Sequence, residues 1–425
     1  MIVRFGTDGV RGPAGQHPIT VDTARRVGSA AARLGARVCV ARDTRPSGEE
    51  LAAAVVTGAV AAGAQVLDAG VLPTSGACLA VADGAADVAV VVTASHNQAS
   101  DNGFKVVGPG AHKLDEAQVE RFEAWLAEPP LRRDGGTSAE CASEAWARWE
   151  RRVEAALPSL EVFRGRKLAV DLAHGAASGA ADWLIRHVPA VWTVIGAGDG
   201  IVNDGVGSEH LEAVGAAVRA HGCEAGLAVD GDADRCRLVD EHGEVVPGDA
   251  VTWLLATSRA AEGIAVTVMS NGALERCLPG VEVVRTPVGD RHLRVAMDAR
   301  GLPLGAEESG HVLFGDFPAG DGLLAGLIAL AAGLGQGIGA ATSGYVPLAR
   351  RLGKVRVQAR PELDTVIPLR DTVAAHEPAL GEFGRIFLRY SGTEPVLRVL
   401  VEGDERVAVD RVFEAVTAVA EEHLI

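Results

Sequence analysis

Short, continuously apolar runs that alternate with helical segments are the feature that most constrains the fold of this chain. Each run is rich in Val, Leu and Ala, ends in a polar loop that contains glycine, and precedes a helical segment. Examples begin at Ala36, Ala86, Arg166, Ile264 and Leu302. Apolar runs of this length are typical of parallel strands buried on both faces of a sheet, so the sequence predicts an α/β fold. The polar loops then lie at the carboxyl ends of the strands, where such sheets bind ligands.

The length of 425 residues suggests about three domains, with four possible. Polar stretches at 129–139, 241–249 and 343–351 interrupt the pattern. The last part of the chain differs from the rest, because its pattern is strand, helix, strand, loop, strand, helix, as in a smaller α+β unit. We therefore predict four domains, at residues 1–140, 141–243, 244–343 and 344–425.

The charge of the chain limits its partners. Its 40 basic and 56 acidic residues give a net charge of −16, which disfavours non-specific binding to nucleic acid or to an anionic membrane. Four of the basic residues are Lys, namely Lys105, Lys113, Lys167 and Lys354, and the other 36 are Arg. If the ligand is anionic, clusters of Arg must therefore overcome the global charge locally.

Several features of the sequence predict a cytoplasmic protein. The N-terminal residues MIVRFGTDGVRG lack the apolar region of a secretory signal. The solid apolar block Leu323–Leu334 is too short to span a bilayer. The six cysteines are scattered without a C-x-x-C pair, which indicates reduced, buried thiols rather than disulfides or a zinc site.

The first candidate for chemistry is the loop Thr93–Asn97, which follows the apolar run VAVVV and continues into Asp101–Lys105. A serine at the end of a buried strand is well placed to act as a nucleophile or phosphate carrier. Ser95 has His96 beside it and Lys105 ten residues further on. The alternative is that Ser95 caps a following helical segment. A nucleophile elbow is excluded, because the G-x-S-x-G pattern is absent.

The second candidate is the turn that contains Asp230, Asp232 and Asp234, after the apolar run GLAV. Three carboxylates at alternate positions of a tight turn repel one another and call for a cation. Hard oxygen ligands without a nearby His or Cys favour Mg²⁺. A solvated acidic turn is the alternative, whereas an EF-hand is rejected because its sixth position would be Arg235 instead of glycine. A phosphatase in which Asp230 itself carries the phosphoryl group is a mechanistic rival.

Two later loops offer contacts for a phosphorylated sugar. The loop Gly305–His311 presents carboxylates, a hydroxyl and an imidazole, which suit sugar hydroxyls but also suit a solvated loop. The loop Arg389–Pro395, with Arg398 beyond it, has the Arg, Ser, Thr and backbone amides of a cradle for a phosphate dianion. A hairpin turn with its hydroxyls facing water is the alternative. The segment Gly335–Ala340 matches a dinucleotide motif only formally, because it follows a helical segment, so we expect a loop there.

A serine carrier, an acidic triad, a sugar loop and a phosphate cradle thus occur in that order along one chain. This combination resembles the α-D-phosphohexomutase family over essentially all 425 residues. The stretches that carry the resemblance are Phe5–Gly12, Thr93–Asn97, Asp101–Lys105, Asp230–Arg235, Val288–Arg291, Glu307–His311 and Ser391–Pro395. The resemblance implies three similar α/β domains and a smaller C-terminal α+β domain around a central cleft, carrying the phosphoserine, metal, sugar and phosphate loops in turn. Within the family, the sequence is most similar to the branch that acts on glucosamine phosphates.

The resemblance implies a phosphoryl shuttle between the protein and a small phosphosugar. Ser95 would be a phosphoserine whose phosphate binds Mg²⁺. The other metal ligands would be Asp230, Asp232 and Asp234, and the adjacent Arg235 would offset excess negative charge. Transfer to glucosamine 6-phosphate or glucosamine 1-phosphate would give a hexosamine 1,6-bisphosphate, the intermediate and activator, whose other phosphate returns to the serine. Catalysis would consist mostly of positioning and charge stabilisation.

The resemblance also divides the other candidate site residues by role. Arg11 and Lys105 would flank the transferring phosphoryl group and assist proton transfer. Further catalytic candidates are His96 and His311. Holding the sugar would be Glu307 and Ser309, together with Asp290 and Arg291. Gripping the non-reacting phosphate would be Arg389, Ser391, Gly392, Thr393 and Arg398.

Four positions depart from the family pattern. Gln98 stands where Pro is usual, and Ala233 stands where Gly is usual, so the backbone at Ala233 is expected to avoid positive φ. Glu308 replaces Gln and His292 replaces Tyr, and these two changes bear on substrate choice. The nearest rival function is therefore the same chemistry on mannose or glucose phosphates. A Mg²⁺-dependent sugar phosphatase and a non-catalytic phosphosugar sensor are more distant rivals.

Overall fold

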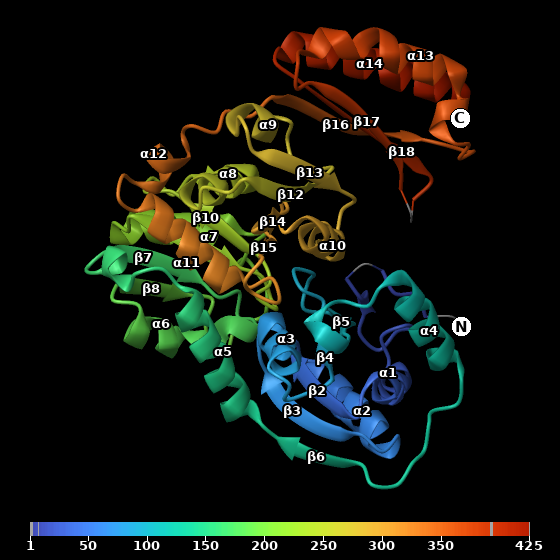
Figure 1. The fold of residues 1–425 in the computed structure, drawn as a ribbon, viewed down its shortest axis with the longest axis vertical. Helices are drawn as coiled ribbons and strands as arrows, with labels where there is room; N and C mark the ends of the chain where they lie inside the picture. The colour runs from blue at the N-terminus through green and yellow to red at the C-terminus, as the bar shows by residue number, and fades with distance from the viewer. Residues whose placement is uncertain (1–2, 7, 392–393, 425) are drawn as a thin grey trace. The chain divides into compact units, whose positions relative to one another are not determined.

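The computed structural model describes residues 3–6, 8–391 and 394–424 of the chain. These residues form four sheets with helices packed on them (Figure 1). Contacts within the chain divide it into two compact units. The larger unit comprises Met1–Met269 and Val284–Thr342, and the smaller unit comprises Ser270–Val283 and Ser343–Ile425.

The first sheet of the larger unit has six strands. They are β1 (Val10–Pro13), β2 (Arg37–Arg42), β3 (Gln65–Val71), β4 (Val88–Val92), β5 (Asp101–Val107) and β6 (Thr137–Glu140), in the order β1-β5-β4-β2-β3-β6. Strand β2 is parallel to β3 and β4, and β3 is parallel to β6, whereas β5 runs antiparallel to both β4 and β1. The accompanying helices are α1 (Val21–Leu34), α2 (Gly48–Ala61), α3 (Thr74–Ala82), α4 (Glu116–Ala127) and α5 (Ala142–Ala156).

Alternation along the inner strands explains why helices cover both faces of this sheet. Val38 and Val40 of β2 belong to one core with residues of α1, α2 and α4. Cys39 and Ala41, between and after them, belong to a second core with residues of α3 and α5. A strand that is apolar on both faces is stable only between two layers. The α/β class expected from the apolar runs is confirmed.

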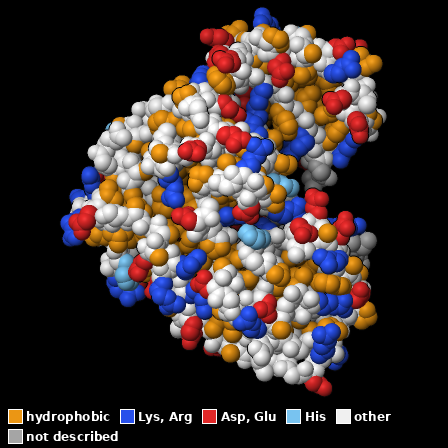
Figure 2. All heavy atoms as spheres, viewed as in Figure 1, with side chains coloured by type: hydrophobic (Ala, Val, Ile, Leu, Met, Phe, Trp, Pro, Cys, Tyr) orange, Lys and Arg blue, Asp and Glu red, His pale blue; other side chains and the backbone are white. Residues whose placement is uncertain are grey.

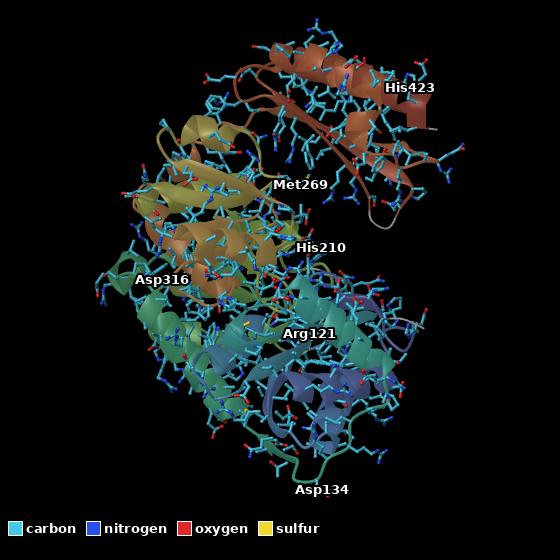
Figure 3. The ribbon with its side chains drawn as sticks, turned by 45° about the vertical axis from the view of Figure 1, so that its right-hand side comes forward. Arg121, Asp134, His210, Met269, Asp316 and His423 are labelled. Atoms are coloured by element: carbon cyan, nitrogen blue, oxygen red, sulfur yellow. The ribbon has the colours of Figure 1, made fainter. Side chains whose placement is uncertain are left out.

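Two segments that the sequence pattern places in loops are strands. Asp101–Lys105 forms most of β5, which pairs with a strand on each side. Its polar residues hide the strand in the sequence, although Asn102 and Phe104 are both fully buried. The polar stretch 129–139 passes through Asp134 (Figure 3) and ends in β6. This strand pairs with β3 at the edge of the first sheet.

The second sheet has five strands in the order β11-β10-β9-β7-β8. They are β7 (Lys167–Asp171), β8 (Val191–Ile195), β9 (Ala225–Val229), β10 (Cys236–Val239) and β11 (Val245–Val246), with helices α6 (Ala181–His187) and α7 (Leu211–His221) between them in the chain. Strands β7, β8 and β9 are parallel, and β10 turns back antiparallel to β9. The turn from β9 to β10 carries the acidic triad.

The third sheet has the order β13-β12-β14-β15. Its strands are β12 (Gly263–Thr267), β13 (Glu282–Thr286), β14 (Leu304–Ala306) and β15 (Val312–Phe314), and the helices of this part are α8 (Gly248–Ser258), α10 (Asp290–Arg300), α11 (Gly322–Gly333) and α12 (Ile338–Thr342). Helix α11 is apolar all round because it is buried against β9, β10 and α8. The buried Asp321 caps this helix and accepts hydrogen bonds from Ser75 of α3 and Trp149 of α5. The expected loop at Gly335–Ala340 ends in the short helix α12.

The smaller unit contains an antiparallel sheet in the order β16-β18-β17. Its strands are β16 (Ala349–Arg356), β17 (Arg385–Tyr390) and β18 (Val396–Gly403), and its helices are α9 (Ala273–Cys277), α13 (Ile367–His376) and α14 (Arg406–Leu424). Helices α13 and α14 cover one face of the sheet, where Val399 and Val401 pack against Val412 and Val416. The predicted order of strand, helix, strand, loop, strand and helix is confirmed. Short 3-10 helices occur at Pro109–Ala111, Leu160–Phe163, Ala176–Ala180, Leu363–Thr365 and Glu377–Leu380.

Two further observations bear on the sequence predictions. Among the described residues, no helix combines the length and the apolar character needed to span a bilayer. Acidic and basic side chains are interspersed on the visible face of the molecule (Figure 2). The four domain boundaries stay a prediction, and β11, just past the boundary at 243, pairs with β10 of the second sheet.

Candidate active site

Ser95 lies three residues past the end of β4 and is fully buried against the turn that holds the acidic triad. Its Oγ donates a hydrogen bond to Oδ2 of Asp230 at 2.5 Å, and it lies 3.3 Å from Nδ1 of His96. The residue has a φ of 52°, a left-handed conformation that is uncommon outside glycine. The segment after Ser95 is a turn that leads into β5, so the alternative of a helix cap is wrong.

The three acidic residues of the β9–β10 turn converge on one point. One carboxylate oxygen from each of Asp230, Asp232 and Asp234 lies within 4.8 Å of the others, and none of the three residues is more than 2% exposed. The alternative of a solvated acidic turn is therefore wrong. Thr74, at the start of α3, donates from its Oγ1 to Oδ2 of Asp232 at 2.5 Å.

The charge and geometry of this turn fit a hard divalent cation. Burial, together with the neighbouring carboxylates of Asp234 and Asp232, raises the pKa of Asp230 to about 7. Oδ1 of Asp232 is buried and has no hydrogen-bond partner among the described residues. Convergent carboxylate oxygens with spare coordinating capacity are the ligands that Mg²⁺ prefers. The residues present thus suit Mg²⁺.

Lys105 reaches the acidic turn from β5. Its Nζ lies 2.7 Å from Oδ2 of Asp232, 2.6 Å from Oδ2 of Asp234 and 3.3 Å from Oδ2 of Asp8. Burial alone would lower the pKa of Lys105, but these carboxylates outweigh it and hold the pKa well above the ordinary value. The ammonium group is therefore a fixed positive charge beside the predicted phosphoryl carrier.

The backbone at Ala233 contradicts the expectation from the sequence. Ala233 has a φ of 58°, inside the left-handed region that it was expected to avoid. The turn requires this conformation, because the Ala233 N–H donates to the Asp230 carbonyl at 2.9 Å while its own carbonyl accepts from Gly322 at 2.8 Å. Alanine tolerates this backbone at a cost of about 1–2 kcal/mol, which the surrounding contacts offset.

Asp8 and Lys113 belong to the site although neither was assigned a role from the sequence. Asp8 pairs with Arg11 of β1 and with Lys113, and Nζ of Lys113 lies 2.7 Å from Oδ1 of Asp290. Burial would raise the pKa of Asp8, but Lys105, Lys113 and Arg11 lower it to about 2. Two signals were present in the sequence: Asp8 lies in one of the family stretches, and Lys113 is one of only four lysines.

The two candidate histidines carry different charges. Burial lowers the pKa of His96 to about 4, helped by Arg235 and Arg11, so this ring is neutral at pH 7. His311 lies with Nδ1 3.6 Å from Oδ1 of Asp234 and Nε2 3.4 Å from Oδ2 of Asp290. These carboxylates outweigh the effect of burial and raise the pKa of His311 to about 10. At neutral pH, His311 is therefore protonated, whereas His96 is neutral.

The predicted sugar loop lies between β14 and β15 and is tied to the acidic turn. The N–H of Cys236, which begins β10, donates to the Gly310 carbonyl at 2.9 Å. Glu307 accepts from the Gly289 N–H at 2.8 Å and from the Ser309 hydroxyl at 3.1 Å, so its carboxylate is oriented by two donors. Glu307 and Ser309 are half-buried, and this partial exposure fits contact with a ligand.

The remaining predicted residues of the larger unit lie around the same site. The Arg235 N–H donates to Oδ1 of Asp230 at 3.1 Å. Arg291, in the first turn of α10, donates to the Leu114 carbonyl at 3.1 Å. A cavity of about 320 Å³ is lined in part by Lys113, Asp234, Asp290, Arg291 and His311. The structure thus brings the serine, metal and sugar loops together within one unit.

The predicted phosphate loop lies in the smaller unit, between β17 and β18. Arg389 and Arg398 are directly opposite each other in the antiparallel pair, and Lys354 of β16 is opposite Arg398 on its other side. Directly opposite residues project from the same face of a sheet, so these three residues form a basic row. The Ser391 N–H donates to the Val396 carbonyl at 2.9 Å, which closes the hairpin. Gly392 and Thr393 lie outside the described residues.

Comparisons with known proteins agree with this site. Successive parts of the chain match the phosphoglucomutase/phosphomannomutase α/β/α domains I, II and III at residues 3–130, 153–243 and 247–341, and the C-terminal domain of the same proteins at residues 352–419. The chain is 41% identical to a phosphoglucosamine mutase of Frankia casuarinae, with 99% of this chain and 98% of the relative covered. It is 40% identical to a phosphoglucosamine mutase of Mycolicibacterium vanbaalenii, with 97% and 99% covered.

Two solved structures share the fold. A phosphoglucomutase/phosphomannomutase family protein from Burkholderia thailandensis aligns with a TM-score of 0.82 at 25% identity, covering 100% of this chain and 98% of the other. The Aspergillus fumigatus N-acetylphosphoglucosamine mutase, solved in complex with GlcNAc-6P and magnesium, aligns with a TM-score of 0.66 at 17% identity, covering 100% and 96%. With these matches over nearly its whole length, the chain belongs to the phosphoglucomutase/phosphomannomutase family, and the expected family is confirmed.

Proposed function

We propose that this protein is a phosphohexomutase that interconverts glucosamine 6-phosphate and glucosamine 1-phosphate, with Ser95 as the phosphoryl carrier. The observation that carries the proposal is the 2.5 Å contact between Ser95 Oγ and Asp230 Oδ2, which places a buried hydroxyl against three convergent carboxylates. The full-length similarity to phosphoglucosamine mutases supports the choice of substrate.

In the proposed reaction, Ser95 begins as a phosphoserine and the free hydroxyl of the substrate attacks its phosphorus. The bond from phosphorus to Ser95 Oγ breaks as the new bond to the sugar oxygen forms, which gives a hexosamine 1,6-bisphosphate. The sugar hydroxyl loses its proton and Ser95 Oγ gains one. The bisphosphate then presents its other phosphate, which returns to Ser95 by the reverse process and releases the isomeric monophosphate.

Mg²⁺ would be held by the phosphate on Ser95 and by Asp230, Asp232 and Asp234, and would neutralise charge on the transferring group. Lys105 adds a fixed positive charge beside that group. Arg11, on the neighbouring strand β1, is proposed to act with it, and Arg235, next to Asp234 in the chain, is proposed to offset the charge of the triad. Positioning and electrostatic stabilisation then supply most of the catalysis.

Proton transfer falls to His96 and His311 in this proposal. The neutral His96, with Nδ1 3.3 Å from Ser95 Oγ, can take the proton when the serine acts as a nucleophile. In the same step, the protonated His311 can supply a proton to the departing sugar oxygen. In the transfer from Ser95 to the sugar, the two histidines exchange these roles, so that Ser95 Oγ gains the proton and the sugar hydroxyl loses one. Because the two transfers run in opposite directions, an acceptor and a donor are both needed in one site.

Binding of the substrate divides between two sets of residues. Glu307 and Ser309, with Asp290 and Arg291 nearby, are proposed to hold the sugar hydroxyls in both of its orientations. The non-reacting phosphate is proposed to bind Arg389, Ser391, Gly392, Thr393 and Arg398 of the smaller unit. A phosphate dianion suits adjacent guanidinium groups, since each can donate two hydrogen bonds to it. We place the reaction in the cytoplasm, and we retain the four domain boundaries of the sequence analysis.

The proposal is tested by ³¹P NMR of the purified protein with Mg²⁺ and a catalytic amount of hexose 1,6-bisphosphate. Glucosamine 6-phosphate, mannose 6-phosphate and glucose 6-phosphate are each offered in turn. We expect the 1-phosphate to form fastest from glucosamine 6-phosphate. Faster conversion of mannose or glucose phosphate would contradict the substrate, and release of inorganic phosphate alone would contradict the reaction.

Glu308 offers a sharper test of the substrate. A carboxylate next to Glu307 would favour a cationic 2-amino group over a hydroxyl, whereas an amide at that position would not. We expect Glu308→Gln to reduce the preference for glucosamine phosphate over glucose phosphate about fivefold, on the order of one charge-assisted contact of about 1 kcal/mol. The ratio of kcat/KM for the two substrates measures this preference. An unchanged ratio would show that Glu308 does not select the amino group.

A further inference from the structure

Arg45, in the connection from β2 to α2, directs its guanidinium group at the backbone of the serine loop. It is 1% exposed. Its Nη2 donates to the carbonyls of Ser95 and Asn97 at 2.8 and 2.7 Å, and its Nη1 donates to the carbonyl of Asp101 at 2.9 Å. Nη1 also contacts the carbonyl of Gln98. One buried side chain therefore holds three carbonyls of the loop that presents the phosphoryl carrier and a fourth at the start of β5.

A ring of hydrogen bonds fixes Arg45 and the loop to each other. Nε of Arg45 donates to Oδ2 of Asp43 at 2.9 Å, within an ion pair whose two side chains are both fully buried. The same oxygen accepts from the Thr93 hydroxyl at 2.7 Å, and that hydroxyl accepts from the Ser95 N–H at 2.9 Å. The N–H and the C=O of Ser95 are thus held by two ends of one network.

A second side chain, from a connection that follows a strand of the second sheet, binds two of these four carbonyls. Nδ2 of Asn203, in the connection from β8 to α7, donates to the carbonyls of Ser95 and Asn97 at 2.8 and 3.0 Å. The acidic turn adds a close approach, because a Cβ placed on Gly231 would lie 2.6 Å from the Ser95 carbonyl oxygen and 3.0 Å from Asn203 Nδ2. Only glycine allows this approach.

These contacts explain how Ser95 keeps its left-handed backbone. A non-glycine residue at a φ of 52° persists only where its surroundings over-determine it. With its carbonyl held by Arg45 and Asn203, the residue keeps a backbone from which its Oγ reaches Oδ2 of Asp230 at 2.5 Å. A relaxed backbone would turn Oγ away from the acidic turn, while the rest of the first sheet could remain folded.

We propose that Arg45 and Asn203 are positioning residues that hold Ser95 in line for phosphoryl transfer in both directions. This inference rests on the proposed function, because it assumes that Ser95 carries the phosphoryl group. Neither side chain is proposed to contact the substrate. Both act through the Ser95 carbonyl, so their loss lowers the rate of transfer and leaves substrate binding in place.

The test compares Asn203→Ala and Arg45→Lys with the unaltered protein. The first variant removes one amide, and the second keeps a positive charge beside Asp43 but cannot donate to four carbonyls. We expect the single-turnover rate of phosphoryl transfer from glucose 1,6-bisphosphate to Ser95 to fall about 10–100-fold in each, since small misplacements cost about 10²-fold. KM for the sugar phosphate should stay within about twofold because the contacts to substrate are intact.

Arg37→Lys is the matched control, because Arg37 lies at the other end of β2 and pairs with Asp87 at 2.6 Å. We expect an unchanged transfer rate for it. If the two test variants lose thermal stability but keep the wild-type transfer rate per folded molecule, the residues are only structural and the inference is wrong. If the unaltered protein takes up no phosphate on Ser95, the proposed function fails and the inference falls with it.

Discussion

The buried site around Ser95 and the exposed basic row of the smaller unit differ in the burial and pairing of their charged side chains. At the buried site, Lys105 is 2% exposed and contacts two carboxylates at 2.6 and 2.7 Å. In the basic row, the Lys354 side chain is 65% exposed, and the carboxylate of Glu394 lies 3.5 Å away. Arg398, beside it, is 53% exposed and lies 3.8 Å from the same Glu394.

This difference follows from what each region is proposed to do. Bond making and breaking needs charges whose positions are set before the substrate arrives, and a buried network provides them because it does not reorganise. A group that only holds the far end of a substrate needs to attract and release it. Exposed cations do this through charge that salt screens. The two regions should therefore respond differently to mutation, pH and salt.

The largest expected effect is at the acidic turn. Asp232→Asn removes one of three carboxylates from a buried site whose metal would supply several kcal/mol, so we expect kcat to fall about 10³-fold. Removal of divalent metal with a chelator should abolish activity, and Mg²⁺ should restore it in the unaltered protein. The matched control is Asp199→Asn, because Asp199 is exposed. A kcat within about twofold of normal for Asp232→Asn would contradict the role of the triad.

In the basic row, Arg398→Ala should act on binding more than on chemistry. Loss of one charge-assisted contact of about 1.5–3 kcal/mol raises KM for the sugar phosphate about 10–100-fold, with a smaller change in kcat. In the unaltered protein, higher salt should also raise KM, because the basic row is exposed and its charges are screened. Arg411→Ala, on an exposed position of α14, serves as the control. If kcat fell as far as it does in Asp232→Asn, the contrast between the two regions would be wrong.

The pH dependence of Mg²⁺ binding tests the charge of the buried site. Asp230 has a pKa of about 7 against an ordinary value of 3.8, so the folded protein binds a proton between these values that the unfolded chain does not. Binding of this proton stabilises the folded, metal-free protein relative to the unfolded chain. The stabilisation is fully present below pH 4 and is lost as the pH rises through 7. Mg²⁺ must displace it, so affinity should fall about tenfold from pH 8 to pH 6.

Isothermal titration calorimetry with Mg²⁺ at pH 6 and pH 8 measures this change. Buffers of different ionisation enthalpy report the release of about one proton per metal ion at pH 6. The same measurement on Asp230→Asn should lose most of the pH dependence. An affinity that does not change between the two pH values would contradict a protonated carboxylate in this turn.

The smallest effect is expected at Lys354, which sequence analysis did not select. Its position opposite Arg398 is the reason to expect any effect at all. Because the side chain is largely exposed, Lys354→Ala should raise KM only about two- to fivefold, within the range of a surface ion pair. Lys167→Ala, at the exposed start of β7, is the matched control. An increase in KM as large as that of Arg398→Ala would make Lys354 an equal member of the phosphate site.

Local patterns in the sequence were enough to find the continuously apolar strands and the loops that follow them. The run from Val38 to Ala41 indicates a strand covered on both faces, because consecutive residues point to opposite faces and all of them are apolar. The three carboxylates of the acidic turn stand close together in the chain, so their convergence is a local property. Strand β5 was missed for the opposite reason: its residues Asp101, Asn102 and Lys105 are polar, so the strand lacks the continuous apolar pattern.

Contacts between distant parts of the chain could not be predicted. Arg45 holds the carbonyl of Ser95, 50 residues away, and Asn203 does the same from 108 residues away. Neither has a local signature, because a backbone carbonyl accepts from any donor the fold brings near it. The sequence wrongly predicted that Ala233 avoids positive φ. That prediction considered the preference of the single residue, whereas hydrogen bonds to other residues hold the turn in this conformation.

The central claim is that Ser95 carries the phosphoryl group, and direct labelling tests it most simply. The protein is incubated with Mg²⁺ and glucose 1,6-bisphosphate labelled with ³²P in both phosphates, then digested, and the labelled peptide is identified. We predict about one phosphate per chain on the peptide that contains Ser95, stable to hydroxylamine, and none in Ser95→Ala. Label that hydroxylamine removes and that maps to the peptide of Asp230, or label that persists in Ser95→Ala, would contradict the account.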